Sequence, residues 1–97
     1  MSKITVSARG QECQVRIPGV CTGDPATVIW SHARWGAAGR GRGIKALDLA
    51  GAYACTACDA AYDGQLKTQY SRAEIDSDWC QGHFRSLVIL NNLGLIA

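Results

Sequence analysis

The chain has 97 residues, a formal net charge of +2, five cysteines and 19% charged residues, which suits one small domain spanning 1–97. The odd number of cysteines argues against a fully paired disulfide framework, the polar first residues do not resemble a secretory signal, and no apolar run approaches membrane-spanning length. We therefore expect a cytoplasmic protein without a membrane partner, in which clustered cysteines bind a metal that supports a small core.

The first third of the chain is predicted to hold a short strand, a cysteine knuckle and a second strand. Residues 3–8 alternate weakly between apolar and polar, which favours a short strand or an ordered arm. Residues 12–21 form the knuckle, and Pro18-Gly19 turns the chain near its second cysteine. After a loop at 22–25, the β-branched and aromatic run 26–30 predicts a strand, with His32 just past its end.

The middle of the chain is predicted to pass from a loop into an extended segment and then a helix. Residues 36–43 include four glycines, and this backbone freedom favours a flexible loop. The apolar segment 47–54 is expected to be extended and leads directly into Cys55. A helix is expected to begin near Cys58, with Asp59 in its first turn, where a negative charge favours the helix dipole.

A long C-terminal helix is predicted over about 72–92. Ser71 and Glu74 have the spacing of a capping box at its start, and Gly94 suits the residue just beyond its end. An approximate apolar stripe follows the helix, and we expect it to be the face that packs on the core. Its members are Trp79, Phe84, Leu87, Val88 and Leu90.

The cysteines are the strongest chemical signal in the sequence. Cys13 and Cys21 form one local pair and Cys55 and Cys58 a second, and four thiolates in two pairs can close a tetrahedral zinc site. An alternative is that His32 replaces one cysteine as a ligand or is a hydrogen-bonded structural histidine. Cys80 lies outside the pattern and is expected to be a small core residue.

The order of these segments is typical of a ββα-metal nuclease finger, the HNH class. A strand, His32, a glycine-rich loop, an extended segment, a CxxC pair and a helix follow one another. In that class a histidine acts as general base on water, and a divalent metal stabilises the charge that develops on the phosphate. We therefore predict an α+β fold: a small zinc-stabilised ββα-metal, HNH-like finger over about 8–65, followed by the C-terminal helix.

Four segments together resemble the small YbcO-type nucleases of lambdoid prophages. They are residues 8–21, 31–34, 45–49 and 54–58, and the resemblance covers roughly 8–65. It implies an HNH-like fold, a structural Zn²⁺ on the four cysteines and hydrolysis of phosphodiester bonds in nucleic acid. DNA is the expected substrate, His32 the expected general base, and a bacterial host cytoplasm the expected location of this phage- or prophage-encoded chain.

One departure from the family pattern concerns the metal on the helix. Members usually continue the CxxC pair with a histidine that binds metal, whereas this chain has Asp59. An aspartate can bind a hard cation such as Mg²⁺ or Mn²⁺, so the change either preserves a metal site or marks a lost activity. Asp63, one helical turn later, shares that metal or is simply solvated. Asp48 takes the place of the central polar residue of the motif, or is a surface aspartate.

Positive charge is concentrated between residues 34 and 45. Guanidinium groups suit phosphate oxygens, so these side chains are candidates for contacts to a nucleic-acid backbone, with ordinary solvated charges as the alternative. The candidates are Arg34, Arg40, Arg42 and Lys45. His83, on the last helix, is expected to be a surface histidine rather than a ligand.

Two other functions fit the same sequence. The first is a zinc-knuckle module that binds DNA without cleaving it, in which Asp59 marks a dead site. The second is a phage protein-interaction domain that uses the helix over 79–90, either as a homodimer face or to bind a phage or host recombination protein. Cleavage separates the nuclease from the first of these, and salt-dependent DNA affinity separates both from the second.

Overall fold

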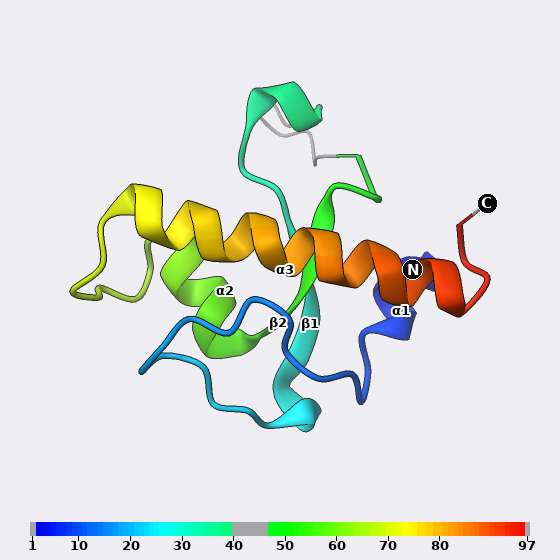
Figure 1. Ribbon diagram of the computed structural model, residues 1–97, viewed down its shortest axis with the longest axis horizontal. Helices are drawn as coiled ribbons and strands as arrows, with labels where there is room; N and C mark the ends of the chain where they lie inside the picture. Colours follow the sequence, from blue (N-terminus) through cyan, green and yellow to red (C-terminus); the bar gives the residue numbers. More distant parts are fainter. Residues whose placement is uncertain (1, 40–46, 97) are drawn as a thin grey trace.

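The computed structural model describes residues 2–39 and 47–96 and has an α+β fold, as predicted (Figure 1). A two-stranded antiparallel sheet lies behind a long helix, α3, with a shorter helix, α2, beside it. The elements are α1 (Lys3–Ser7), β1 (Val28–His32), β2 (Gly51–Cys55), α2 (Thr56–Tyr62) and α3 (Arg72–Asn92), with 3-10 turns at Pro25–Thr27 and Gly36–Ala38. In the part of the chain described, no helix is both long and apolar enough to span a bilayer.

The sheet pairs the two strands predicted before and after the glycine-rich segment. His32 is the last residue of β1 and lies opposite Gly51, the first residue of β2. A Cβ atom at Gly51 would come within 2.4 Å of the Trp30 indole, so this glycine allows the ring to cross the sheet. Trp30 also packs edge-on against Tyr53, with ring centroids 5.2 Å apart. The predicted strand starts too early, because Pro25–Thr27 forms a 3-10 turn capped by the preceding aspartate.

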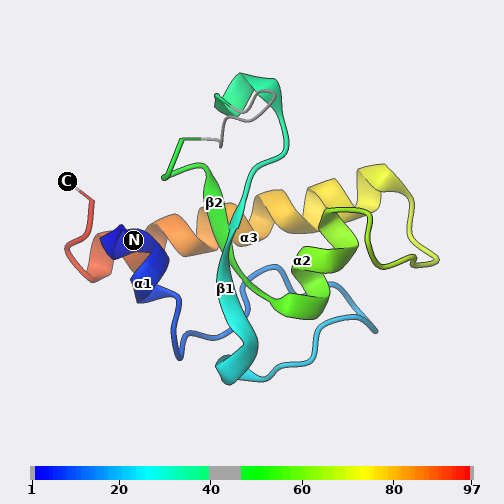
Figure 2. The ribbon, with the colours of Figure 1, turned by 180° about the vertical axis from the view of Figure 1, so that it is seen from behind.

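The prediction of a strand at residues 3–8 is wrong, because this segment forms α1. Ser2 caps the helix by accepting a hydrogen bond from the Thr5 amide at 3.1 Å. Ser7 then shares a hydrogen bond of 2.7 Å with the Tyr53 hydroxyl, which fixes the helix beside β2. Seen from behind, α1 lies near one end of α3, on the far side of the sheet from α2 (Figure 2).

The limits predicted for the C-terminal helix are confirmed. Ser71 and Glu74 form a reciprocal capping box at the start of α3, and Gly94 follows its end with φ of 74°. The centre of α3 is attached to the sheet through Ser86, whose hydroxyl accepts from the Tyr53 amide at 2.9 Å and donates to the Gly82 carbonyl at 2.6 Å. Both bonds are buried, so they are shielded from competition by water.

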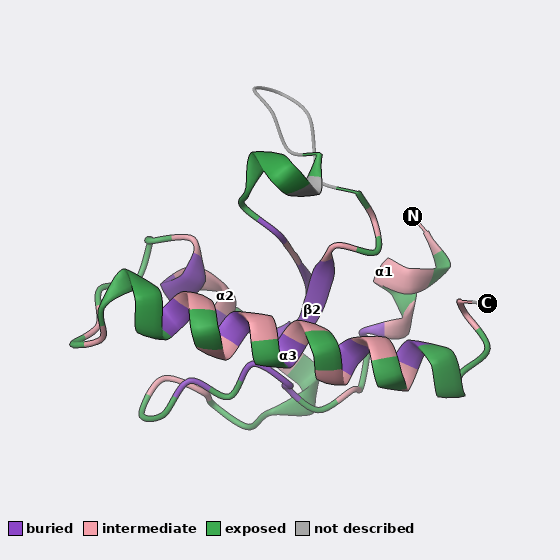
Figure 3. Ribbon diagram, turned by 45° about the horizontal axis from the view of Figure 1, so that its top comes forward, coloured by how far each residue is buried: buried purple, intermediate pink, exposed green. Residues whose placement is uncertain are grey.

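The predicted core face of α3 is only partly correct. Trp79 and Leu90 are buried, but Phe84 and Val88 are 66% and 61% exposed. Figure 3 shows buried and exposed positions alternating along α3. The residues that face the core are Ile75, Trp79, Gly82, Ser86 and Leu90. The small residues lie inward because the helix approaches the knuckle closely: a Cβ atom at Gly82 would lie 2.8 Å from the Val15 Cα. A hydrophobicity pattern cannot identify a buried helix face whose packing residues include glycine and serine.

Replacing Gly82 with alanine should therefore destabilise the fold. The added methyl group meets the backbone of Val15, which cannot rotate away, so we expect the free energy of unfolding to fall by about 1–3 kcal/mol. Chemical denaturation followed by circular dichroism measures this change. Ser77→Ala, on the exposed face of the same helix, is the control and should shift stability by no more than about 0.5 kcal/mol. Equal stabilities would show that α3 does not pack this closely.

Candidate functional site

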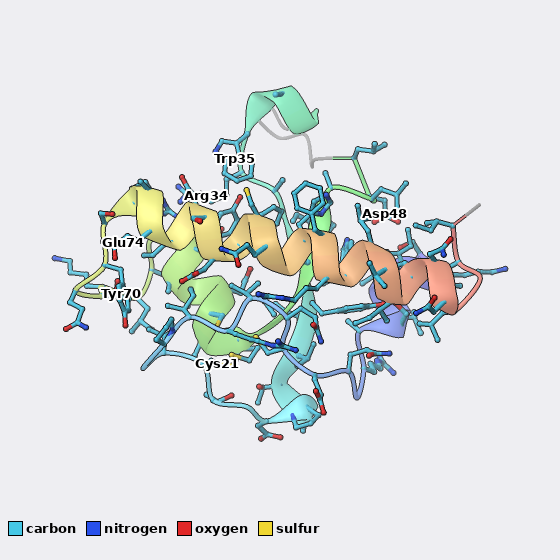
Figure 4. All side chains as sticks on the ribbon, in the orientation of Figure 1. Cys21, Arg34, Trp35, Asp48, Tyr70 and Glu74 are labelled. Atoms are coloured by element: carbon cyan, nitrogen blue, oxygen red, sulfur yellow. The ribbon has the colours of Figure 1, made fainter. Side chains whose placement is uncertain are left out.

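The four predicted cysteine ligands come together in one cluster. The sulfur atoms of Cys13, Cys21, Cys55 and Cys58 all lie within 4.8 Å of one another. Three of these residues are buried and Cys21 is partly exposed; Figure 4 shows it beside α2. All four are free thiols. This spacing matches four sulfur atoms arranged around a single metal ion.

Local backbone geometry places each pair of sulfur atoms. Cys55 ends β2 and is also the N-cap of α2, where its Sγ accepts a hydrogen bond from the Cys58 amide at 3.4 Å. In the knuckle, the Ile17 carbonyl accepts from the Cys21 amide at 2.9 Å, which closes the turn. Arg16 has a left-handed φ of 55°, and its Nε donates to the Cys13 carbonyl at 3.2 Å. Such strained turns around cysteines are common where a metal over-determines the backbone.

The ionisation of the cluster favours a bound cation. A hydrogen bond from the Cys58 thiol lowers the pKa of Cys13 to about 4, whereas that same bond raises the pKa of Cys58. Burial raises the pKa of Cys21. The neighbouring thiols therefore stabilise one thiolate, that of Cys13, but each further cysteine that loses its proton adds a negative charge that repels it. A divalent metal offsets this repulsion and deprotonates the remaining ligands, so the donor set fits a soft cation such as zinc.

A second group of polar side chains lies at the end of β1. The Trp79 indole donates to the Ser31 hydroxyl at 3.0 Å, and Ser31 donates to Asp59 Oδ1 at 2.6 Å. Burial raises the pKa of Asp59, while the bond from Ser31 and the neighbouring His32 ring both oppose that rise. The position of the Asp59 carboxylate therefore depends on a chain of hydrogen bonds that starts on α3 and passes through Ser31.

His32 itself is half-buried at the rim of the sheet. Among the described residues, its Nδ1 is a buried side-chain nitrogen that has no hydrogen-bond partner. An unpaired buried donor or acceptor costs about 1–3 kcal/mol, so proteins retain one mainly where it serves a ligand or a reaction. His32 is not a ligand of the cysteine cluster, because the four sulfur atoms fill that site. The hypothesis that His32 replaces one cysteine is therefore wrong.

His83 lies close to the same end of the sheet. Its Nδ1 is 2.6 Å from the carbonyl oxygen of Gly51, the residue opposite His32, and its ring stacks on Trp79 at 5.7 Å. Within the described residues His83 is not part of the cysteine cluster, in line with the expectation that it is not a ligand, but it is half-buried and hydrogen-bonded rather than fully exposed. No sequence signal indicated this contact, because it joins residues 32 positions apart through the packing of α3 on β2.

Arg34 has a structural partner as well as an exposed guanidinium. Its Nη1 donates to the Tyr62 carbonyl at 2.6 Å, and its amide donates to the Tyr62 hydroxyl at 2.9 Å. Arg72 donates to the same carbonyl at 2.7 Å. Two cations thus lie at the C-terminus of α2, where the helix dipole favours positive charge. Figure 4 shows Arg34 and Trp35 above α3, on the segment that follows β1.

The remaining candidates are placed less closely or lie outside the described residues. Asp63 lies 4.0 Å from Arg34 Nε, and Asp48 contributes its backbone carbonyl, which accepts from the Trp30 indole at 2.7 Å. In Figure 4 Asp48 and Arg34 lie on the same side of α3 but at well-separated positions along the helix. Over residues 2–39 and 47–96, the four cysteines form the one cluster of three or more possible metal ligands. Asp48 and Asp63 do not belong to a second such cluster in these residues. Arg40, Arg42 and Lys45 lie outside the described residues.

Sequence reasoning missed Ser31 and Trp79 as parts of the site. Ser31 precedes His32 directly, and alternation along a strand places neighbouring side chains on opposite faces. Ser31 is nevertheless buried and reaches Asp59, since it faces α2 and α3. A serine inside an otherwise apolar and aromatic strand was the available signal, because a buried hydroxyl needs partners.

Comparison with known proteins places this site in a phage context. The family model described as "Putative nuclease YbcO" matches residues 2–95. Two curated proteins, "Putative nuclease YbcO" of Escherichia coli (strain K12) and "Putative nuclease ybcO" of Enterobacteria phage 82, are each 46% identical over 63 residues, which is 65% of this chain. The match spans 65% of each relative, slightly less than two thirds of its length.

A solved structure shares the fold over nearly the whole chain. It is titled "Structure of a putative bacteriophage protein from Escherichia coli str. K-12 substr. MG1655" and is 34% identical, with a TM-score of 0.77. The match covers 93% of this chain and 98% of that one. The likeness therefore includes α3, beyond the segments in which the sequence resemblance is evident.

The cysteine cluster can be tested with a spectroscopic metal. Cobalt bound by four sulfur atoms gives intense charge-transfer absorption, and we expect this signal when the metal-free protein is titrated with Co²⁺. Cys21→Ser removes one sulfur atom and should weaken both the absorption and the affinity. Cys80→Ser is the matched control and should leave both unchanged, because Cys80 lies outside the cluster. An unchanged spectrum for Cys21→Ser would contradict the four-sulfur assignment.

Proposed function

The chain belongs to the YbcO family, and from this premise we propose that it is a metal-dependent endonuclease that hydrolyses phosphodiester bonds in DNA. The relatives are named nucleases of a bacterium and a phage, which suggests a phage- or prophage-encoded enzyme working in the bacterial cytoplasm. The HNH-like mechanism, the substrate and the residue roles below are part of the proposal.

The observation that carries the proposal is the state of His32. His32 is the last residue of β1, and its buried Nδ1 has no hydrogen-bond partner in the described part of the chain. A histidine with an ordinary structural role would satisfy that nitrogen, as His83 does with the Gly51 carbonyl. A half-exposed imidazole with a free nitrogen has an atom available to accept a proton from a bound water molecule.

His32 is proposed as the general base. It accepts a proton from water as the water oxygen bonds to phosphorus, and the bond to the leaving oxygen breaks. Asp59 is the proposed ligand for a divalent ion, with Asp63 and Asp48 as further candidates; when bound, Mg²⁺ or Mn²⁺ supplies charge stabilisation at the phosphate. Ser31 holds one oxygen of Asp59 at 2.6 Å, which leaves the second oxygen for the ion. Such an ion commonly keeps several water ligands, so a few carboxylate contacts suffice.

The cysteine cluster is proposed as a structural zinc site. It fits zinc because four cysteine sulfur atoms within 4.8 Å of one another would fill all positions of a four-coordinate site and leave none open for a substrate. The zinc would attach the knuckle to the junction of β2 and α2, and so fix the residues next to it. Asp59 follows Cys58 directly, and the zinc would thus set the position of the catalytic carboxylate without taking part in the reaction.

DNA binding is assigned to the positive side chains that follow β1. Arg34, with 38% of its side chain exposed, is already held by the Tyr62 carbonyl and so presents its remaining N–H groups without further ordering. Arg40, Arg42 and Lys45 follow in the sequence and supply the rest of the positive charge. Phosphate contacts of this kind predict weak sequence preference and affinity that falls steeply with salt.

A DNA-binding module without catalysis is the second candidate. It is favoured by Asp59 itself, because the carboxylate stands where relatives of this type usually carry a histidine, and its partner Ser31 gives it a structural role. In this case the fold and the zinc site would be kept while the reaction is lost. Cleavage alone distinguishes the two candidates, since both bind DNA.

The first test is plasmid nicking by zinc-loaded protein with added Mg²⁺, Mn²⁺ or neither. We expect nicking that needs the added ion and falls by at least about 100-fold in His32→Ala, because the general base is lost. DNA binding, measured by gel retardation at low salt, should be unchanged in this variant. His83→Ala, which removes a nearby histidine that already has a partner, is the control. Binding without nicking under every condition would instead identify a binding module.

The role of Asp59 can be tested by restoring the histidine of the family pattern. In Asp59→His, an imidazole replaces the carboxylate, so the ion that best supports nicking should shift from Mg²⁺ towards Co²⁺ or Ni²⁺. Initial nicking rates across a series of divalent ions measure this shift. Asp24→His, in an exposed turn, is the control and should keep the original order of ions. An unchanged order in Asp59→His would remove Asp59 from the catalytic metal site.

A further inference from the structure

α3 carries a regular pattern on the side that faces solvent. Every third or fourth residue along this side is exposed and uncharged, with spacings of four, three, four and three. The residues are Ser77, Gln81, Phe84, Val88 and Asn91. This spacing is that of the a and d positions of helices that pack side by side, and two of the five residues, Phe84 and Val88, are apolar. In Figure 3 exposed positions recur along the face of α3 that is turned away from the sheet.

The pattern is distinct from the face that packs on the sheet. The buried residues of α3 lie on the opposite side of the helix, and they include Trp79, Gly82 and Ser86. Phe84 and Val88 nevertheless remain 66% and 61% exposed, one helical turn apart. Two adjacent apolar side chains this exposed on a rigid helix are suited to contact another molecule.

We propose that α3 pairs with α3 of a second copy of this chain, in antiparallel orientation about a two-fold axis. In this arrangement Gln81 packs beside Phe84 of the second copy, and Ser77 packs beside Val88. The symmetry repeats each contact twice, as in other isologous dimers. A helix of 21 residues is about 31 Å long, so several such layers fit along the pair.

Charge favours the antiparallel orientation. Asp78 and Arg85 are seven residues apart, each directly after a residue of the repeat, so they lie along the same edge of the exposed face. Antiparallel pairing brings Asp78 of each copy beside Arg85 of the other. Arg85 is already held along this edge, since it donates to the Gln14 carbonyl at 2.7 Å and to Gln81 Oε1 at 3.4 Å. Parallel pairing would instead place Glu74 beside Glu74 of the second copy, which is repulsive.

The composition of the repeat predicts a reversible dimer rather than an obligate one. Phe84 and Val88 supply the apolar contact, while Gln81 and Asn91 are polar residues of the kind that specify register at a cost in stability. Dimerisation should therefore depend on protein concentration. It does not depend on nuclease activity, and it would hold equally for a DNA-binding module.

Sedimentation velocity of the full, metal-loaded chain over a concentration series tests the pairing. We expect a monomer–dimer equilibrium, and Phe84→Asp should weaken it by at least about tenfold because it puts two carboxylates in the apolar layers. Leu66→Asp is the control: Leu66 is 42% exposed but precedes α3, so the dimer should persist. A monomer at every concentration, or a dimer that Phe84→Asp leaves intact, would overturn the proposal.

Charge reversal tests the orientation. Asp78→Arg should weaken the dimer because it faces Arg85 of the second copy, and adding Arg85→Glu should restore it. Asp24→Arg makes the same change in net charge in the exposed turn before β1 and should have no effect on dimerisation. If circular dichroism shows that Arg85→Glu disturbs the fold through its bond to Gln14, the comparison of Asp78→Arg with Asp24→Arg tests the orientation instead. Equal dimer affinities in those two variants would overturn the antiparallel arrangement.

Discussion

The cluster of four cysteine sulfur atoms connects the knuckle, which has no regular secondary structure, to the sheet and to α2. The knuckle over residues 9–24 contains no helix or strand, and its cysteines join it to Cys55 and Cys58 at the junction of β2 and α2. A two-stranded sheet is marginally stable in water unless something covers it. The knuckle supplies part of that cover, because buried Val15 and Ile17 lie between its cysteines. A metal at the cluster would therefore hold together the same core that positions Asp59.

Signals that act over a few residues could be predicted from the sequence. The capping box at Ser71 and Glu74 set the start of α3, and the CxxC pair identified half of the metal cluster. Residues 3–8 show the opposite case: their weak alternation indicated a strand, but Ser2 offers a local N-cap and β1 and β2 pair only with each other among the described residues. A strand needs a distant partner, which a local pattern does not reveal.

Close packing, rather than the hydrophobic pattern, determines which face of α3 is buried. The pattern placed Phe84 and Val88 inside, yet Gly82 and Ser86 take those inner positions because the helix approaches Val15 and the Tyr53 amide closely. Close approach requires small residues, and small residues contribute little to a hydrophobic stripe. The larger apolar side chains are consequently turned outward. The exposed repeat of α3 is thus a result of the same constraint that attaches the helix to the sheet.

The candidate site contains residues that the sequence indicated and a hydrogen-bond network around them that it did not. The roles proposed for His32 and Asp59 come from their places at a strand end and after a CxxC pair, but the position of the Asp59 carboxylate depends on Trp79, twenty residues further along the chain. Because the indole donates to Ser31 and Ser31 donates to Asp59, any movement of α3 would also move the carboxylate. The helix therefore acts as part of the site although it carries none of the proposed catalytic groups. Because α3 packs directly on β2 in this small fold, buried core residues such as Trp79 and Ser31 are also the ones that orient the proposed catalytic carboxylate of Asp59.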